Sequence, residues 1–154
     1  INAAHAHGVP VIIDPKGSNW TKYEHADYIT PNLKEINAVL PDPIRNEDAP
    51  VEQAAHDVMK RFHLGSIIVT RSEAGLSLIC EGEIKHIPTK AQEVFDVSGA
   101  GDTVIAVFAM GIAGGIAPVA SAYLANLAAG VVVAKLGTYA VSREELLKAL
   151  EKEK

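Results

Sequence analysis

Short runs of apolar residues along the first half of the chain predict buried strands that alternate with helices. Residues 9–14, 26–30 and 66–70 are rich in β-branched residues and end at loop signals, which is typical of strands. Residues 33–40 and 51–63 carry apolar residues on one helical face, while the prolines of 41–50 predict a loop. Strand and helix therefore alternate up to residue 70.

The second half of the chain follows different patterns. Residues 76–81 and 83–88 flank a short turn at Glu81, Gly82 and Glu83, which predicts an antiparallel hairpin. The stretch from Thr103 to Ala134 carries no charge, but glycines and a proline interrupt it, so two packed core helices are favoured over a membrane span. Ser142 and Glu145 form a capping-box pattern before a charged C-terminal helix.

These elements together predict an α/β fold with a mostly parallel sheet and helices on both faces. A chain of 154 residues with 48% hydrophobic residues is sufficient for one domain with a real core. The net charge of −5 gives no support for binding to nucleic acid or to an acidic membrane. The single cysteine, Cys80, excludes a disulfide within the chain and fits a reducing cytoplasm, with Cys80 as a core residue.

The segment FDVSGAGDT, residues 95–103, carries the clearest chemical signal. Gly99, Ala100 and Gly101 allow successive N–H groups to point at one anion, and a helix beginning at Asp102 would add its dipole. Asp102 is then placed as a general base that takes the proton of an attacking hydroxyl, while Asp96 shapes the loop or a cation site. The alternative is a tight strand-to-helix turn with Asp102 as a plain N-terminal charge.

Four segments in order resemble the ribokinase-like (PfkB) family of carbohydrate kinases. DVSGAGDT resembles the second signature of that family, Asn32 to Glu35 its N-x-x-E segment, Thr70 to Gly75 its nucleotide loop, and Asn126 its later ATP-site helix. Neither of the two common phosphate-binding motifs, G-x-x-x-x-G-K-[ST] and G-x-G-x-x-G, occurs in the sequence. Within the family, DPKG (14–17) and AKLGT (134–138) are most similar to kinases of D-glycero-β-D-manno-heptose 7-phosphate.

This resemblance implies transfer of phosphate from ATP, with Mg²⁺, to the anomeric hydroxyl of that heptose, on the route to ADP-heptose and lipopolysaccharide. It implies that Asp102 is the base and that Gly99, Ala100 and Gly101 form the anion hole. Asn32 and Glu35 would organise Mg²⁺ through water. The residues implied at the nucleotide are Ser72, Gly75, Asn126, Gly137, Thr138 and Lys16.

The chain also departs from the family. Val97 replaces a usual threonine, and Arg71 and Ser72 replace the usual x-Gly of the nucleotide loop. The N-terminal sugar-binding half and its β lid do not appear, and the first residue is Ile1 rather than methionine. Residues 1–154 are therefore expected to be the C-terminal, ATP-binding portion of a longer protein, which the resemblance implies is a homodimer.

Simpler interpretations remain open for several residues. His5 and His7 suit a solvent-facing helix end, Trp20 lies in a polar loop, and Arg71 or Lys16 alone is more often surface charge. Asn32 and Glu35 could serve only as a helix cap, and Asn126 as a buried amide satisfied by backbone. The alternative functions are another sugar kinase of the family, or a nucleotide-binding fragment without catalysis.

Overall fold

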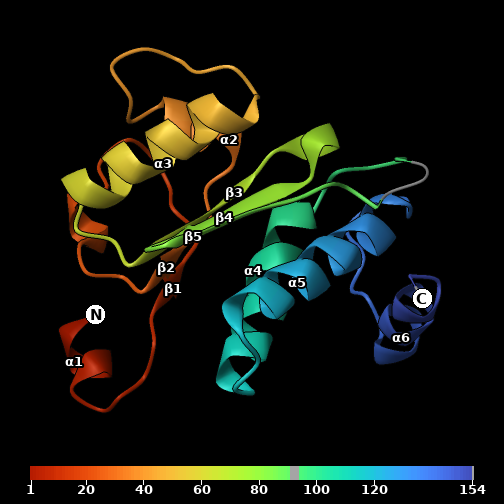
Figure 1. The fold of residues 1–154 in the computed structure, drawn as a ribbon. Helices are drawn as coiled ribbons and strands as arrows, with labels where there is room; N and C mark the ends of the chain where they lie inside the picture. Colours follow the sequence, from red (N-terminus) through yellow and green to blue (C-terminus); the bar gives the residue numbers. More distant parts are fainter. Residues whose placement is uncertain (91–93, 154) are drawn as a thin grey trace. The chain divides into compact units, whose positions relative to one another are not determined.

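The computed structural model describes residues 1–90 and 94–153, which form two compact units, Ile1–His86 and Ile87–Lys154. The first unit contains a sheet and short helices (Figure 1), which in chain order are α1 (Asn2–His5), β1 (Ile12–Ile13), η1 (Thr21–Tyr23), β2 (Tyr28–Ile29), α2 (Leu33–Asn37), α3 (Asp48–Arg61), β3 (Ser66–Thr70), η2 (Ser72–Ala74), β4 (Leu76–Cys80) and β5 (Glu83–Ile87). The second unit contains α4 (Ala100–Ala113), α5 (Pro118–Val133) and α6 (Arg143–Glu151).

The sheet has the strand order β1-β2-β3-β4-β5. β1, β2 and β3 are parallel, and β4 runs antiparallel to β3, which confirms the predicted parallel strands and the change of direction after them. β1 and β2 are shorter than the predicted 9–14 and 26–30. The Asp27 carboxylate accepts the Val11 N–H at 2.7 Å, so this N–H bonds to a side chain instead of a neighbouring strand directly before β1, while the Val11 carbonyl still accepts from backbone.

The core of the first unit lies between α3 and the strands that it packs against, β3 and β4. α3 buries Val51, Ala54, Ala55 and Val58. It begins at Asp48, so the prediction that the loop extends to residue 50 is wrong. Pro50 falls in the first turn, where its missing N–H breaks no helical hydrogen bond.

Trp20 lies in a polar loop as predicted, but its side chain is fully buried although its neighbours in sequence are polar. Its ring centroid lies 6.0 Å from that of Phe62, and the indole N–H donates to the Gly17 carbonyl at 2.9 Å. Satisfying the N–H is what allows the large ring to be buried without an unpaired donor. The polarity of the loop therefore does not indicate the burial of this residue.

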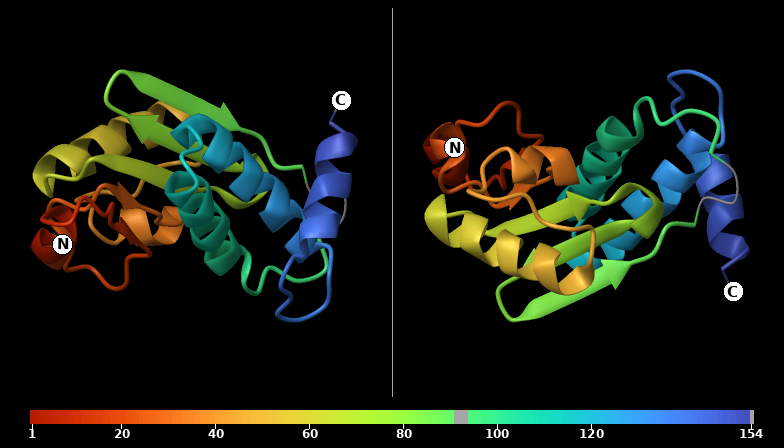
Figure 2. Two further views of the ribbon diagram at one scale, coloured as in Figure 1. Left: turned by 90° about the horizontal axis from the view of Figure 1, so that it is seen from below. Right: turned by 90° about the horizontal axis from the view of Figure 1, so that it is seen from above.

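In the second unit, α4 and α5 lie side by side in both views of Figure 2, as the two predicted core helices. Their contact requires glycine at position 111, since a Cβ there would lie 2.8 Å from the Ser121 Cβ. α6 packs against α5. Among the residues that the structure describes, no helix is long and apolar enough to cross a membrane.

Glu145 fixes the start of α6. It accepts the Ser142 N–H at 3.0 Å, completing the predicted capping box, and both of its carboxylate oxygens accept from the Tyr139 hydroxyl at 3.0 Å. Lys135 Nζ lies 3.3 Å away. The hydrogen bonds from Ser142 and Tyr139 lower the pKa of Glu145 from 4.5 to about 2.

We therefore expect a pH-dependent contribution of Glu145 to stability. Because its folded pKa lies below its unfolded pKa, the contribution is complete above pH 4.5 and is lost as the pH falls towards about 2. Melting temperatures followed by circular dichroism should show Glu145→Gln less stable than wild type at pH 6, with the difference shrinking below pH 4.5. Glu144→Gln is the charge-matched control, and an equal pH-dependent difference in that variant would contradict the assignment.

Candidate active site

The segment 95–103 forms the beginning of α4 in the second unit. Gly99 is the N-cap in the left-handed conformation, with φ 80° and ψ 0°, and the helix begins at Ala100 rather than at Asp102 as predicted. The Gly99 carbonyl accepts from both the N–H and the hydroxyl of Thr103, at 2.9 and 2.8 Å, and closes the first turn early. Asp102 is therefore an exposed first-turn residue.

The predicted anion hole is partly occupied by the turn itself. The Ala100 N–H donates to the Val97 carbonyl at 3.2 Å. The N–H groups of Gly101 and Asp102 belong to the first turn, where the helix supplies no acceptor and the helix dipole is positive. An anion at this helix start would therefore contact Gly101 and Asp102 more readily than Ala100.

Asp96 links this segment to the loop after α5. Its carboxylate accepts the Ser98 N–H at 2.8 Å and the Gly137 N–H at 3.1 Å. The hydrogen bond from the Ser98 side chain, followed by those from the Ser98 and Gly137 N–H groups, lowers the pKa of Asp96. A Cβ at Gly99 would lie 3.5 Å from Thr138 Cγ2. The structure thus brings Gly99, Gly137 and Thr138 together and confirms that Asp96 shapes the loop.

Asn126 is a buried amide satisfied by backbone, as its simpler interpretation predicts. It lies on α5, is 6% exposed, and its amide nitrogen donates to the Pro88 carbonyl at 2.8 Å. A buried amide needs such a partner, and a backbone carbonyl provides it. If Asn126 has the nucleotide role that the resemblance implies, it would contact the nucleotide through its amide oxygen or by van der Waals packing.

In the first unit, Asn32 and Glu35 form a complete capping box. Asn32 Oδ1 accepts the Glu35 N–H at 2.9 Å, and Glu35 Oε2 accepts the Asn32 N–H at 2.8 Å. Lys16 Nζ lies 2.8 Å from the Asp14 carboxylate and 3.3 Å from Glu35 Oε1. The hydrogen bonds with Asp14 and Glu35 raise the pKa of Lys16, so Lys16, Asn32 and Glu35 form one polar group.

This group fits a hydrated Mg²⁺ better than a directly bound one. The oxygens of Asn32 and Glu35 are hard donors of the kind that Mg²⁺ accepts, but they already receive backbone hydrogen bonds. Within residues 1–90 and 94–153 no group of three or more His, Cys, Asp or Glu side chains is placed to hold a metal. His5, for example, pairs with Asp27 at 2.9 Å at the exposed end of α1.

The predicted nucleotide loop joins β3 to β4. Ser72 and Gly75 both have positive φ, 52° and 83°, so Ser72 adopts a conformation that suits the glycine found there in the family. Asn32 forms a parallel bridge with Thr70, and the Thr70 N–H donates to the Pro31 carbonyl at 2.9 Å. Asn32 is therefore placed beside the last residue of β3, directly before the loop of residues 71–75.

Arg71 is the main correction at this site. The prediction of surface charge is wrong, because the residue is 3% exposed and its guanidinium contacts Asp48, Asn46, Ser77 and His86. No sequence spacing links these residues, since they come from a loop, a helix and two strands. Only the fold brings them together.

A groove of about 530 Å³ lies between α5 and α6, and none of the predicted site residues lines it. Its lining is apolar along α5 and lysine-rich elsewhere, and it includes Leu127, Val131, Lys90, Lys135, Lys148 and Lys152. Lys90 and Lys135 pair there with Glu153 and Glu145. Internal ion pairing thus reduces the positive charge that this groove offers to a ligand.

Comparisons with known proteins match almost the whole chain. The sequence model of the pfkB family carbohydrate kinases matches residues 1–145. The bifunctional protein HldE of Trichlorobacter lovleyi is 49% identical over 153 residues, which are 99% of this chain and 31% of that protein. The chain therefore spans under a third of the curated relatives that it matches.

Two solved structures share the fold. A ribokinase from Thermotoga maritima is 28% identical with a TM-score of 0.84, over 97% of this chain and 52% of its own. The ribokinase of Arabidopsis thaliana, in complex with ribose and ATP, is 25% identical with a TM-score of 0.86, over 97% of this chain and 50% of its own. These matches confirm the predicted ribokinase-like fold.

Proposed function

We propose that this chain, which belongs to the pfkB family of carbohydrate kinases, is the ATP-binding part of a kinase acting on D-glycero-β-D-manno-heptose 7-phosphate. The support is the resemblance of its motifs to those heptose kinases together with its 49% identity to HldE. The product would be the 1,7-bisphosphate used for ADP-heptose. Its relatives are much longer, so the complete activity requires more chain than these residues.

In the proposed reaction the anomeric hydroxyl oxygen attacks the γ-phosphorus of ATP. A new O–P bond forms, the bond from the γ-phosphorus to the bridging oxygen breaks, and ADP leaves with the electron pair. Asp102 accepts the hydroxyl proton, and the first-turn N–H groups of α4 stabilise charge on the transferred group. An exposed carboxylate at a helix start suits this task because substrate can reach it.

The resemblance supports nucleotide roles for Ser72 and Gly75 and for Gly137, Thr138 and Asn126. Lys16 is a candidate phosphate contact. Asn32 and Glu35 would hold Mg²⁺ through its water ligands, and the bound ion would neutralise phosphate charge. The proposed partners are the phosphorylated heptose and a second copy of the kinase-length protein, meaning a chain long enough to contain the whole kinase. We place this protein in the cytoplasm and propose no binding to nucleic acid or membrane.

One observation carries the proposal: the arrangement at the start of α4. Gly99 is left-handed, the first turn of α4 begins at Ala100, and Asp102 is exposed. The carboxylate of Asp96 links this segment to Gly137, and Thr138 lies next to Gly99. A plain structural turn needs neither the exposed carboxylate nor the second glycine loop beside it. A site that binds an anion and deprotonates an acceptor hydroxyl uses first-turn N–H groups and an accessible carboxylate.

Calorimetric titration of the chain with Mg·ATP tests the nucleotide part. We expect saturable binding that weakens in Gly101→Val, because a β-branched side chain would cover the first-turn N–H groups. Ala113→Val places the same side chain at the exposed end of α4 and should bind as wild type. Equal affinity in all three proteins would contradict the site.

The sugar is tested in the kinase-length protein, by following ADP release with a set of phosphorylated and free sugars. Heptose 7-phosphate should give the highest kcat/KM. A higher value for another sugar would favour the other family kinases, and nucleotide binding without turnover of any sugar would favour the non-catalytic alternative.

A further inference from the structure

Arg71 brings a buried positive charge to the base of the predicted nucleotide loop. It directly follows β3 and is 3% exposed. Nη1 donates to Asp48 Oδ1 at 2.6 Å and to Ser77 Oγ at 2.9 Å, and Nε donates to Asn46 Oδ1 at 2.9 Å. The side chain is therefore fixed by partners from the loop before α3, from α3 and from β4.

His86 of β5 extends this network. Its Nδ1 lies 3.3 Å from Arg71 Nη1 and 2.7 Å from Ser77 Oγ, and its Nε2 lies 2.7 Å from Glu52 Oε1. Arginine can only donate, so Nδ1 accepts, and the proton on Nε2 is donated to Glu52. The Arg71 guanidinium also lowers the pKa of Asp48. Nη1 carries two protons, so its shorter contacts with Asp48 and Ser77 are its main hydrogen bonds, and the 3.3 Å contact with His86 is weaker.

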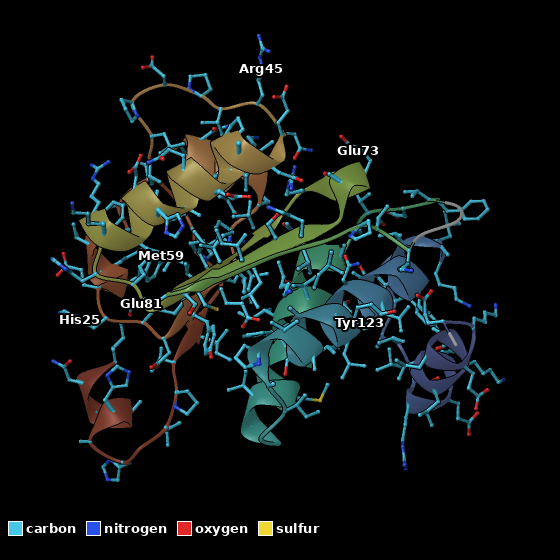
Figure 3. The ribbon with its side chains drawn as sticks, in the orientation of Figure 1. His25, Arg45, Met59, Glu73, Glu81 and Tyr123 are labelled. Atoms are coloured by element: carbon cyan, nitrogen blue, oxygen red, sulfur yellow. The ribbon has the colours of Figure 1, made fainter. Side chains whose placement is uncertain are left out.

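The network also holds the backbone of the loop, whose place beyond β3 is marked by Glu73 in Figure 3. The Asn46 amide that accepts from Arg71 Nε also donates to the Arg71 carbonyl at 3.0 Å. The Arg71 N–H donates to the Gly75 carbonyl at 2.8 Å, and the Ala74 N–H donates to the Arg71 carbonyl at 3.0 Å. Side chain and backbone of Arg71 are therefore held together.

Stability alone does not account for a charge at this position. Replacing both partners of a buried ion pair with apolar residues is often neutral for stability, because the desolvation cost of the charges disappears with them. A fixed conformation does account for it, since the loop keeps Ser72 at φ 52° and Gly75 at φ 83°. A serine with positive φ persists only where its surroundings determine the backbone.

We propose that Arg71 is a positioning residue, which holds the loop of residues 71–75 in the conformation that receives the nucleotide. Its buried guanidinium anchors the first residue of the loop to Asp48, Asn46 and Ser77. The loop is then preformed, and binding does not have to pay for ordering it. This inference rests on the proposed function for the identity of the ligand, but not for the rigidity of the loop.

Arg71→Met tests both parts, because methionine fills a similar space without the hydrogen bonds. Hydrogen exchange should become at least about tenfold faster at the Ala74 and Gly75 amides, while the β3 amides stay protected. If the receptive conformation falls to about a tenth of the population, the Kd for Mg·ATP rises about tenfold. The melting temperature should also fall, because methionine leaves the buried Ser77 hydroxyl and the other partners of Arg71 without their donor.

Two further variants complete the experiment. Val58→Ala removes buried methyl groups from α3 and should lower the melting temperature while leaving loop exchange and the Kd for Mg·ATP unchanged. Asn46→Ala, at a partly buried loop position, should reproduce the faster exchange and weaker binding even if Arg71→Met does not fold.

The outcomes separate the two proposals. Unchanged hydrogen exchange at Ala74 and Gly75 in both Arg71→Met and Asn46→Ala would overturn the positioning role, regardless of the Kd for Mg·ATP in these variants. Faster exchange with an unchanged Kd would overturn the link to the nucleotide. A wild-type chain that binds no Mg·ATP, even when it is completed to kinase length, would overturn the proposed function and the nucleotide role of Arg71 with it.

Discussion

Asp102→Asn in the kinase-length protein should fold and bind Mg·ATP as wild type does but transfer phosphate about 10²–10⁴-fold more slowly, because the amide cannot accept the proton of the sugar hydroxyl. The variant keeps the shape of the side chain at an exposed first-turn position, so the start of α4 should not change. The loss should appear in kcat rather than in the KM for ATP. ADP release at saturating sugar and nucleotide measures it.

Glu81→Gln provides the matched control, since it makes the same carboxylate-to-amide change at the exposed turn between β4 and β5. It should keep the wild-type rate. Near-normal turnover of Asp102→Asn would exclude Asp102 as the base. An unchanged kcat with weaker ATP binding would instead indicate that Asp102 acts on the nucleotide.

Trp20→Ala should reduce the free energy of unfolding by about 3–5 kcal/mol, since it removes a large buried ring and leaves a cavity. Trp20 is fully buried, packs near Phe62 and belongs to the core under α3. It is the only tryptophan, so urea unfolding must be followed by circular dichroism rather than by indole fluorescence. A loss of this size is a large fraction of the stability of an ordinary domain.

Trp20→Phe separates ring burial from the hydrogen bond of the indole N–H to Gly17. Phenylalanine retains much of the apolar contact but cannot donate, so its destabilisation should be clearly smaller than that of alanine. Equal losses in the two variants would mean that the hydrogen bond dominates. A loss below 1 kcal/mol in Trp20→Ala would contradict the burial of the ring.

Elements with strong local signals could be predicted from sequence. The buried run of β3 matches residues 66–70, the turn at Glu81 and Gly82 separates β4 from β5, and the N-cap Asn32 and the capping box at Ser142 begin α2 and α6 where expected. Elements whose bounds depend on residues distant in sequence could not be predicted in this way. β1 is limited by the side chain of Asp27, which lies beyond any local pattern.

In the candidate site too, features with a local sequence signal could be predicted and features that depend on distant partners could not. The resemblance identified the segment 95–103 and the Gly137 loop, and their proximity follows from the fold. The environment of Arg71 could not be predicted, because its partners at Asn46, Asp48, Ser77 and His86 are scattered through the sequence. A charged residue after a strand is exposed on average, and only tertiary contacts reverse that.

The close approach of α4 and α5 at Gly111 and Ser121 has a consequence for the order in which the chain folds. The two helices are joined by residues 114–117 alone, so their contacts link residues that are near in sequence. Little chain entropy is lost in closing so short a connection, and local contacts of this kind form quickly. We therefore expect this helical hairpin to form before the pairing of β1, β2 and β3, whose strands are separated by long stretches of chain.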